Sequence, residues 1–261
     1  MLRKIFSKIS GKSERQLATE ALRAAAIKGD LARARREIIR GAEVDAKDVN
    51  DLTPLYFAVS RGYTEVARLL LDKGADVDAG TPGGGSGTAL TVAAYSGYAE
   101  CVKLLMDRGA RHDLTDYDGR TPLHVAVYQG HDDLALHILS RGVDVNSVSR
   151  SGNSPLHEAM NRDNQELSAA LIRAGADWTL KDRWGAPAED RAIAKQLHDV
   201  TAAIKYEKER PQREAAAEAA AALRKAQEYA AALAAADTLQ NDTALPPPLK
   251  LRRRSEGPAS P

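Results

Sequence analysis

One ten-residue pattern recurs four times along the chain. It reads TPLYFAVSRG from Thr53, TALTVAAYSG from Thr88, TPLHVAVYQG from Thr121 and SPLHEAMNRD from Ser154. Successive copies begin 35, 33 and 33 residues apart. A nearly constant period of this length indicates a solenoid, in which small units stack because none of them can bury its apolar face alone.

Each copy carries the local signals of a short helix followed by a second one. A Thr or Ser before a proline, as in Thr121–Pro122, supplies an N-cap and a first-turn residue. A glycine then ends the helix at Gly62, Gly97 or Gly130, where the backbone can turn left-handed. A second apolar run and a turn rich in Gly, Asp and Asn complete the unit.

The Thr–Pro–Leu–His motif and its period resemble the ankyrin repeat family over about residues 16–190. The resemblance implies an all-α solenoid of antiparallel helix pairs, with β-hairpin fingers and a concave face. It also implies a structural role for the motif residues Thr53, Thr88, Thr121, His124, Ser154 and His157.

Counting in steps of 33 adds a unit at each end and predicts about six units. In the first unit, Glu37 stands where an interior unit has Leu70, so we expect this position to face water. A local shift toward Ile38 and Ile39 is the alternative.

In the sixth unit, Gln196 replaces the turn glycine. We therefore expect one uninterrupted helix, and its apolar stripe is predicted to cover the fifth unit. The stripe consists of Ile193, Leu197, Val200 and Ile204.

Histidines and acidic residues give little support to a catalytic or metal site. His124 and His157 fall at framework positions under the family resemblance, and His131 lies on another face, so metal ligands do not converge. Asp132 and Asp133 begin a helix, where acidic side chains complement the helix dipole. No phosphate-binding or nucleophile motif occurs in the sequence. We expect a protein that is not an enzyme and uses no metal or cofactor.

The family resemblance points to the finger tips and the ends of the first helices as the partner-binding surface. Tyr, Trp and Arg dominate interface energetics, and they cluster there from Tyr95 onward with net positive charge. We expect a scaffold or adaptor that binds an acidic or aromatic-bearing protein segment. Nucleic acid is disfavoured because the basic residues are spread out. The candidate partner-binding residues are Arg61, Tyr95, Tyr117, Arg120, Tyr128, Gln129, Arg150, Asn161, Arg162, Arg183 and Trp184.

One finger, AGTPGGGSG at residues 79–87, is two residues longer than its counterparts. It lacks the lysine of a phosphate-binding loop. We interpret it as a flexible, elongated finger, and a dedicated ligand loop is the alternative.

The composition divides the chain into a repeat domain at residues 16–209 and flanking segments. Residues 1–15 contain a basic stretch with an apolar stripe, whose alternatives are a membrane-surface or targeting helix, docking on the first unit, and disorder. A membrane-associated regulator or bacterial effector is therefore the alternative function. With a single cysteine and no apolar run long enough for a membrane span, the expected compartment is the cytoplasm.

Residues 210–240 form an alanine-rich predicted helix, which Pro211 is expected to break or kink away from the repeats. It is either a lone solvated helix or a coiled-coil-like segment that binds a partner or a second copy. Residues 241–261 are a Pro- and Arg-rich tail that we expect to be disordered.

Overall fold

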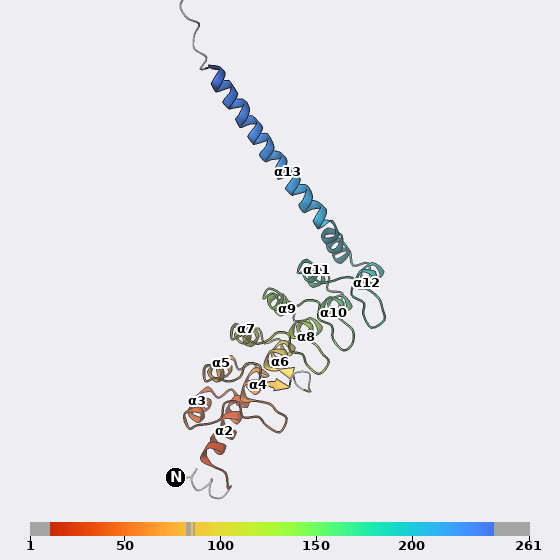
Figure 1. Cartoon of the computed structure of the whole chain (residues 1–261). Helices are drawn as coiled ribbons and strands as arrows, with labels where there is room; N and C mark the ends of the chain where they lie inside the picture. Colours follow the sequence, from red (N-terminus) through yellow and green to blue (C-terminus); the bar gives the residue numbers. More distant parts are fainter. Residues whose placement is uncertain (1–10, 82–84, 86, 243–261) are drawn as a thin grey trace, which may run out of the picture. The chain divides into compact units, whose positions relative to one another are not determined.

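The computed structural model describes residues 11–81, 85 and 87–242 of the 261-residue chain. Within these residues the repeats form six helix pairs, which confirms the predicted all-α solenoid (Figure 1). The pairs are α2 (Glu14–Lys28) with α3 (Leu31–Ile39), α4 (Pro54–Val59) with α5 (Thr64–Asp72), α6 (Ala89–Ser96) with α7 (Ala99–Asp107), α8 (Pro122–Gln129) with α9 (Asp132–Leu139), α10 (Pro155–Asn161) with α11 (Gln165–Arg173), and α12 (Ala188–Ala194) with the start of α13 (His198–Asp242).

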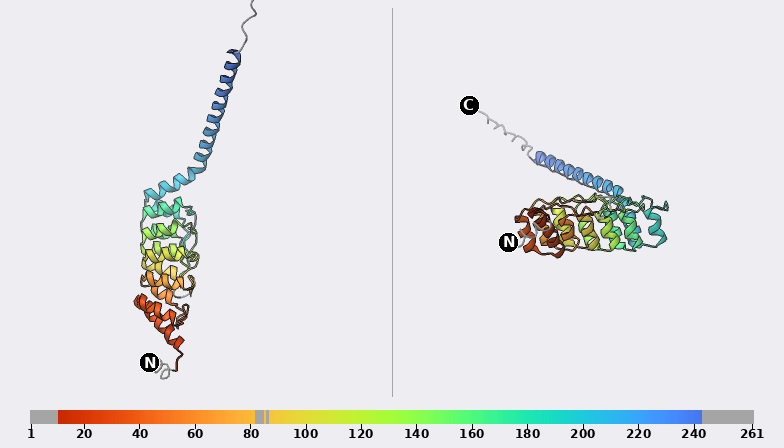
Figure 2. Two further views of the ribbon diagram at one scale, coloured as in Figure 1. Left: turned by 90° about the vertical axis from the view of Figure 1, so that its left-hand side faces the viewer. Right: turned by 90° about the horizontal axis from the view of Figure 1, so that it is seen from below.

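The helices stand in two rows. The first helices of the units pack side by side in one row, namely α2, α4, α6, α8, α10 and α12. The second helices α3, α5, α7, α9 and α11 form the other row (Figures 1 and 2). The fingers that connect the units extend beside the first row (Figure 1). The arrangement therefore presents the first helices and the fingers on a common side of the solenoid.

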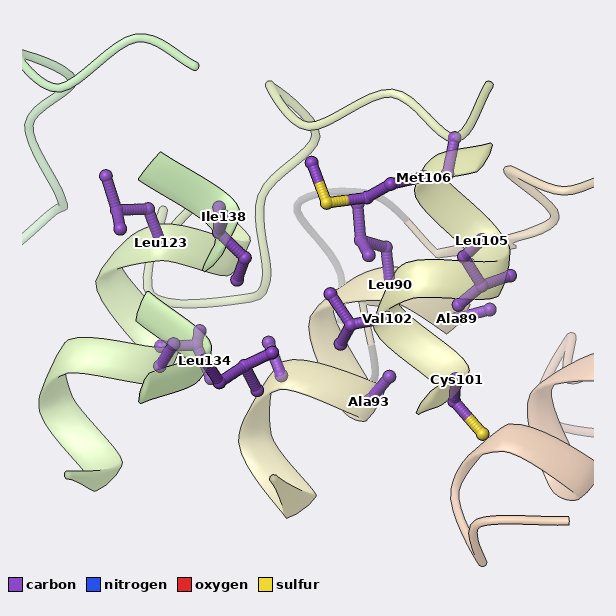
Figure 3. Packing of buried hydrophobic residues seen from close by; sticks show 14 of the residues in the cluster. Ala89, Leu90, Ala93, Cys101, Val102, Leu105, Met106, Leu123, Leu134 and Ile138 are labelled. Carbon is purple, nitrogen blue, oxygen red and sulfur yellow. The ribbon is translucent and has the colours of Figure 1, made fainter. Parts of the chain in front are cut away.

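The core is built from leucine and alanine at repeated positions. Leu90 and Leu105 of the third unit and Leu123 and Ile138 of the fourth belong to one cluster, so the apolar layer continues from one unit to the next (Figure 3). At the same repeat position, each first helix has a fully buried alanine, whose small side chain lets neighbouring helices approach closely. These alanines are Ala25, Ala58, Ala93, Ala126, Ala159 and Ala192.

The predicted N-caps are present in the structure. The side-chain oxygens of Thr53, Thr88, Thr121 and Ser154 each accept a hydrogen bond from the backbone N–H three residues later. Each bond satisfies one of the amide donors that a helix start leaves without a partner.

The fingers are closed by short-range backbone pairing. The long finger contains β1 (Gly80–Thr81) and β2 (Gly87–Thr88), which pair antiparallel. Other fingers close with one N–H···O bond of 3.0 Å, as from Asp48 to Leu52 and from Asp116 to Arg120. The expectation of flexibility in the long finger concerns residues 82–84 and 86, which lie outside the described residues.

The expectation that Glu37 faces water is wrong. Its side chain is only 2% exposed, and its carboxylate accepts a hydrogen bond of 3.1 Å from Arg40 and lies 3.8 Å from Arg36. Its side chain is therefore buried while the carboxylate is compensated by basic groups that remain accessible. Ile38 packs partly against the core, whereas Ile39 is exposed.

The expectation of one uninterrupted helix in the sixth unit is also wrong. A turn separates α12 from α13, and Gln196 takes the left-handed conformation at φ 56°. The Leu197 N–H donates to the Ala192 carbonyl at 2.9 Å and closes the turn. Ile193 consequently leaves the predicted stripe and is exposed, whereas Leu197, Val200 and Ile204 are buried.

The described chain forms two compact units, which meet between Lys208 and Glu209. The helix α13 contributes to both and continues through Pro211, so the predicted break at this residue is wrong. The predicted features of residues 1–10 and 243–261 lie outside the described residues. Among the helices that the structure describes, none is long and apolar enough to traverse a lipid bilayer.

Two glycines in turns differ in how closely the neighbouring unit packs against them. Gly97 and Gly109 both have positive φ, at 71° and 81°. A Cβ on Gly97 would lie 2.7 Å from the His131 ring, whereas a Cβ on Gly109 would have no neighbour within 4 Å. We expect Gly109→Ala to lower the free energy of unfolding by about 1 kcal/mol through backbone strain, and Gly97→Ala to lower it at least about twice as much. Urea denaturation measures both; equal losses would contradict the close contact.

Candidate functional site

One of the motif histidines connects consecutive units. His124 is buried, its Nδ1 lies 2.9 Å from the Thr121 hydroxyl, and its Nε2 lies 3.1 Å from the Asn153 carbonyl of the next finger. His157 repeats the first contact, at 2.8 Å from the Ser154 hydroxyl. Both rings are buried, away from any open surface that a substrate could reach. Only His124 is seen to bond to the following finger, because the buried Nε2 of His157 has no hydrogen-bond partner among the described residues.

Burial also keeps the motif histidines neutral. It lowers the pKa of His124 below its ordinary value of 6.5, against the raising effect of the hydrogen bond to Asn153. Burial lowers the pKa of His157 as well, and the positive charge of Arg191 adds to this effect. The neutral ring is the form that the folded units favour.

Exposed aromatic rings and arginines form pairs along the fingers and the first helices. The Arg120 guanidinium lies 5.0 Å from the ring centre of Tyr128, and Arg150 lies 5.0 Å from that of Tyr117. In the sixth unit, Arg183 lies 4.1 Å from the ring centre of Trp184. The three rings are 50%, 60% and 64% exposed, respectively, so each ring remains accessible to a partner. Arg150 and Arg183 are exposed, whereas the Arg120 side chain is 20% exposed and pairs with Asp116 and Asp118. We call these three pairs the Arg–aromatic row.

Acidic residues at the finger bases hold the row in place. Asp116 accepts hydrogen bonds from the Asp118 and Arg120 amides, both 2.9 Å long, and binds the Arg120 guanidinium at 2.9 Å. Asp182 has the same role in the finger before α12, where it accepts hydrogen bonds from the Trp184 and Ala186 amides. The guanidinium and indole groups therefore stand on fixed loops.

The electrostatics of Asp182 reflect this arrangement. Burial would raise the pKa of its carboxyl, but hydrogen bonds from the Ala186 and Trp184 amides and the charge of Arg191 lower it overall. Asp182 is thus an anion that anchors the finger.

A groove of about 420 Å³ lies beside the Arg–aromatic row, between the finger at residues 116–120 and the first helices. Its lining includes Tyr95 and Tyr117, which are candidate partner-binding residues from the sequence, and also Tyr56. Sequence reasoning missed Tyr56, because it stands at the motif's histidine position and that position implies framework. The replacement of histidine by tyrosine was the signal that could have revealed it.

Some candidate residues are engaged within the protein. Arg162 donates to the Val127 carbonyl at 2.9 Å and to Asp132 at 3.0 Å, so it covers the end of α8. Asn161 accepts from Arg191. Arg61 is exposed after α4 and Gln129 is half-buried at the end of α8. The more accessible candidates in the structure are therefore Tyr95, Tyr117, Tyr128, Arg150, Arg183 and Trp184, whereas Arg120 is held by Asp116 and Asp118.

Comparison with known proteins supports the repeat assignment. A family model described as ankyrin repeats (3 copies) matches residues 5–81, 22–116 and 90–182. The chain is 40% identical over 83 residues to human ankyrin repeat and KH domain-containing protein 1, which covers 32% of this chain and 3% of that protein. It is 53% identical over 55 residues to the Drosophila melanogaster ankyrin repeat and KH domain-containing protein mask, which covers 21% of this chain and 1% of that protein.

A shorter relative is the mouse protein phosphatase 1 regulatory subunit 27, 38% identical over 64 residues, which cover 24% of this chain and 42% of that protein. The chain thus spans less than half of each of these relatives. The similarity concerns the repeats themselves.

Two arginine substitutions distinguish a side chain that supports the fold from one that is available to a partner. We expect Arg162→Ala to lower the free energy of unfolding by about 1–3 kcal/mol, because the Val127 carbonyl and Asp132 lose a charged donor. Arg183→Ala should change it by less than about 0.5 kcal/mol, because the Arg183 guanidinium lies over the exposed Trp184 ring and its removal leaves no backbone carbonyl without a donor. Urea denaturation of both variants measures this; equal effects would show that Arg162 is not framework.

The neutral state of His124 predicts a pH dependence. Because its folded pKa is lowered, the unfolded chain takes up the proton first as the pH falls below 6.5. This contribution to stability is complete above pH 6.5 and is lost as the pH falls toward the folded pKa, by at most about 1.4 kcal/mol per pH unit. His124→Gln should flatten the change in urea midpoint between about pH 7.5 and pH 5.5. His198→Gln, at an exposed position, is the control and should keep the original slope; an unchanged slope in His124→Gln would refute the prediction.

Proposed function

Because this chain belongs to the ankyrin repeat family, we propose that it is a non-catalytic scaffold or adaptor that binds a protein partner through the Arg–aromatic row. Ankyrin repeats are generally protein–protein interaction modules, and the family is typically non-enzymatic. The partner segment that fits best is acidic and carries aromatic residues.

The exposed Arg–aromatic row is the observation on which this proposal rests. Arginine, tyrosine and tryptophan supply most of the energy at protein interfaces, and here three pairs follow one another on the same side of the solenoid. Arg120 already binds Asp116 and Asp118, so the exposed arginines Arg150 and Arg183 are the charges that we propose to meet a carboxylate. An acidic segment can therefore bind several pairs in succession, while its aromatic side chains pack in the neighbouring groove.

The cytoplasm is the compartment we propose. The single cysteine, Cys101, is a buried thiol within α7, and a chain with one such cysteine is compatible with a reducing environment.

Selection from a library of random linear peptides, with the full chain as bait, tests this function. We expect enriched peptides to be acidic with aromatic residues. The double variant Arg150→Ala, Arg183→Ala should weaken binding of an enriched peptide about tenfold or more, measured by fluorescence anisotropy.

The control variant Arg68→Ala, Lys103→Ala removes the same charge from the second helices α5 and α7 and should bind normally. If both double variants lose affinity equally, the effect is one of net charge, and the row is not the binding surface. If no peptide sequence is enriched, the proposal of a linear acidic partner fails.

A further inference from the structure

The C-terminal end of the solenoid presents a side chain that interior units bury. Ile193 occupies the motif position held by Ala94, Val127 and Met160 in the three preceding units, and these three residues are fully buried. Ile193 itself is 61% exposed. The last unit therefore keeps the apolar character of an interior unit at a position where no further unit follows in the described repeats.

A hollow lies directly beside this exposed side chain. It has a volume of about 230 Å³ and lies between α12 and the first turns of α13. Its lining residues are Glu189, Ile193, Thr201, Ile204, Lys205 and Lys208. An apolar projection next to a hollow of this kind suits a two-fold interface, in which each copy supplies both parts.

The charges around the hollow are also self-complementary. Glu189 and Asp190 lie on α12, whereas Lys205 and Lys208 lie on α13, and Lys208 pairs with Glu189 within the chain. A two-fold axis through this end brings the acidic edge of one copy to the basic edge of the other. Oppositely charged edges thereby surround the apolar centre.

In the first unit, Ile39 is 81% exposed, but it lines a hollow together with Leu69 of α5, between the first two units. The hollow beside α2 is lined by polar and charged side chains, and Arg15 pairs with Glu43 there at 3.0 Å. Stacking one chain's C-terminal end on another's N-terminal end would place Ile193 against these charges. Pairing of two C-terminal ends avoids burying these charged groups against Ile193.

We propose that two copies of this chain associate through their C-terminal solenoid ends, with Ile193 of each copy inserted in the hollow of the other. The contact is separate from the Arg–aromatic row. Because one end of a solenoid is a small surface, the dimer is weak and its population depends on concentration.

Sedimentation velocity of the full chain, over roughly a hundred-fold range of concentration, tests this dimer. The original chain should shift from monomer to dimer, and Ile193→Asp should raise the dissociation constant at least about tenfold, because a charge then replaces the buried apolar group. Leu223→Asp is a matched control, since Leu223 is also 61% exposed but lies in the second compact unit. It should leave the dimer unchanged.

Lys208→Glu should also weaken the dimer, and adding Glu189→Lys should restore it, because the two-fold arrangement exchanges both charges. Circular dichroism checks that each variant is folded. A chain that stays monomeric at every concentration overturns the proposal, as does a dimer that Ile193→Asp leaves intact. Loss of the dimer only in Leu223→Asp would place self-association on the alanine-rich helix and would also overturn it.

Discussion

Everything in this fold depends on contact between neighbouring units. A single pair of short helices cannot bury its own apolar face, so each unit is stable only through the next one. Fully buried alanines such as Ala93 and Ala126 let successive first helices come close. The His124 ring adds a polar connection to this contact, because it links the cap of its own helix to the Asn153 carbonyl of the following finger. The same contact fixes the spacing of the fingers, and with it the spacing of the exposed arginines.

Much of this architecture could be read from the sequence, because the period and the caps are local signals. The Thr–Pro and Ser–Pro starts predict helix N-termini, and their spacing predicts the number of units. The turn at Gln196 could not be predicted in this way, because a non-glycine residue is held left-handed there by the Leu197–Ala192 backbone bond and by packing of the following helix. A non-glycine residue in the left-handed conformation costs about 1 kcal/mol in conformational free energy, which such contacts can override.

The proposed binding surface was less predictable than the fold. Repeat positions indicate which residues share a face, but not which side chains find partners some 30 residues away in sequence. Arg162 is such a case, since it reaches back to Val127 and Asp132 in the preceding unit. Arg183 stands at an equally exposed sequence position and stacks on its neighbour Trp184 instead. The difference depends on the acceptors that the preceding unit places within reach.

The turns of the last two units are unlike those before them, since Asp163 and Gln196 adopt positive φ where the earlier units have glycine. Strain of this kind lowers the cost of local opening, so we expect the stability of the solenoid to decline toward α12. Amide protons there should exchange with solvent earlier than those of the central units. If the proposed partner binds the Trp184 finger, part of its binding energy would go into ordering these last repeats, and recognition would be coupled to local folding at that end.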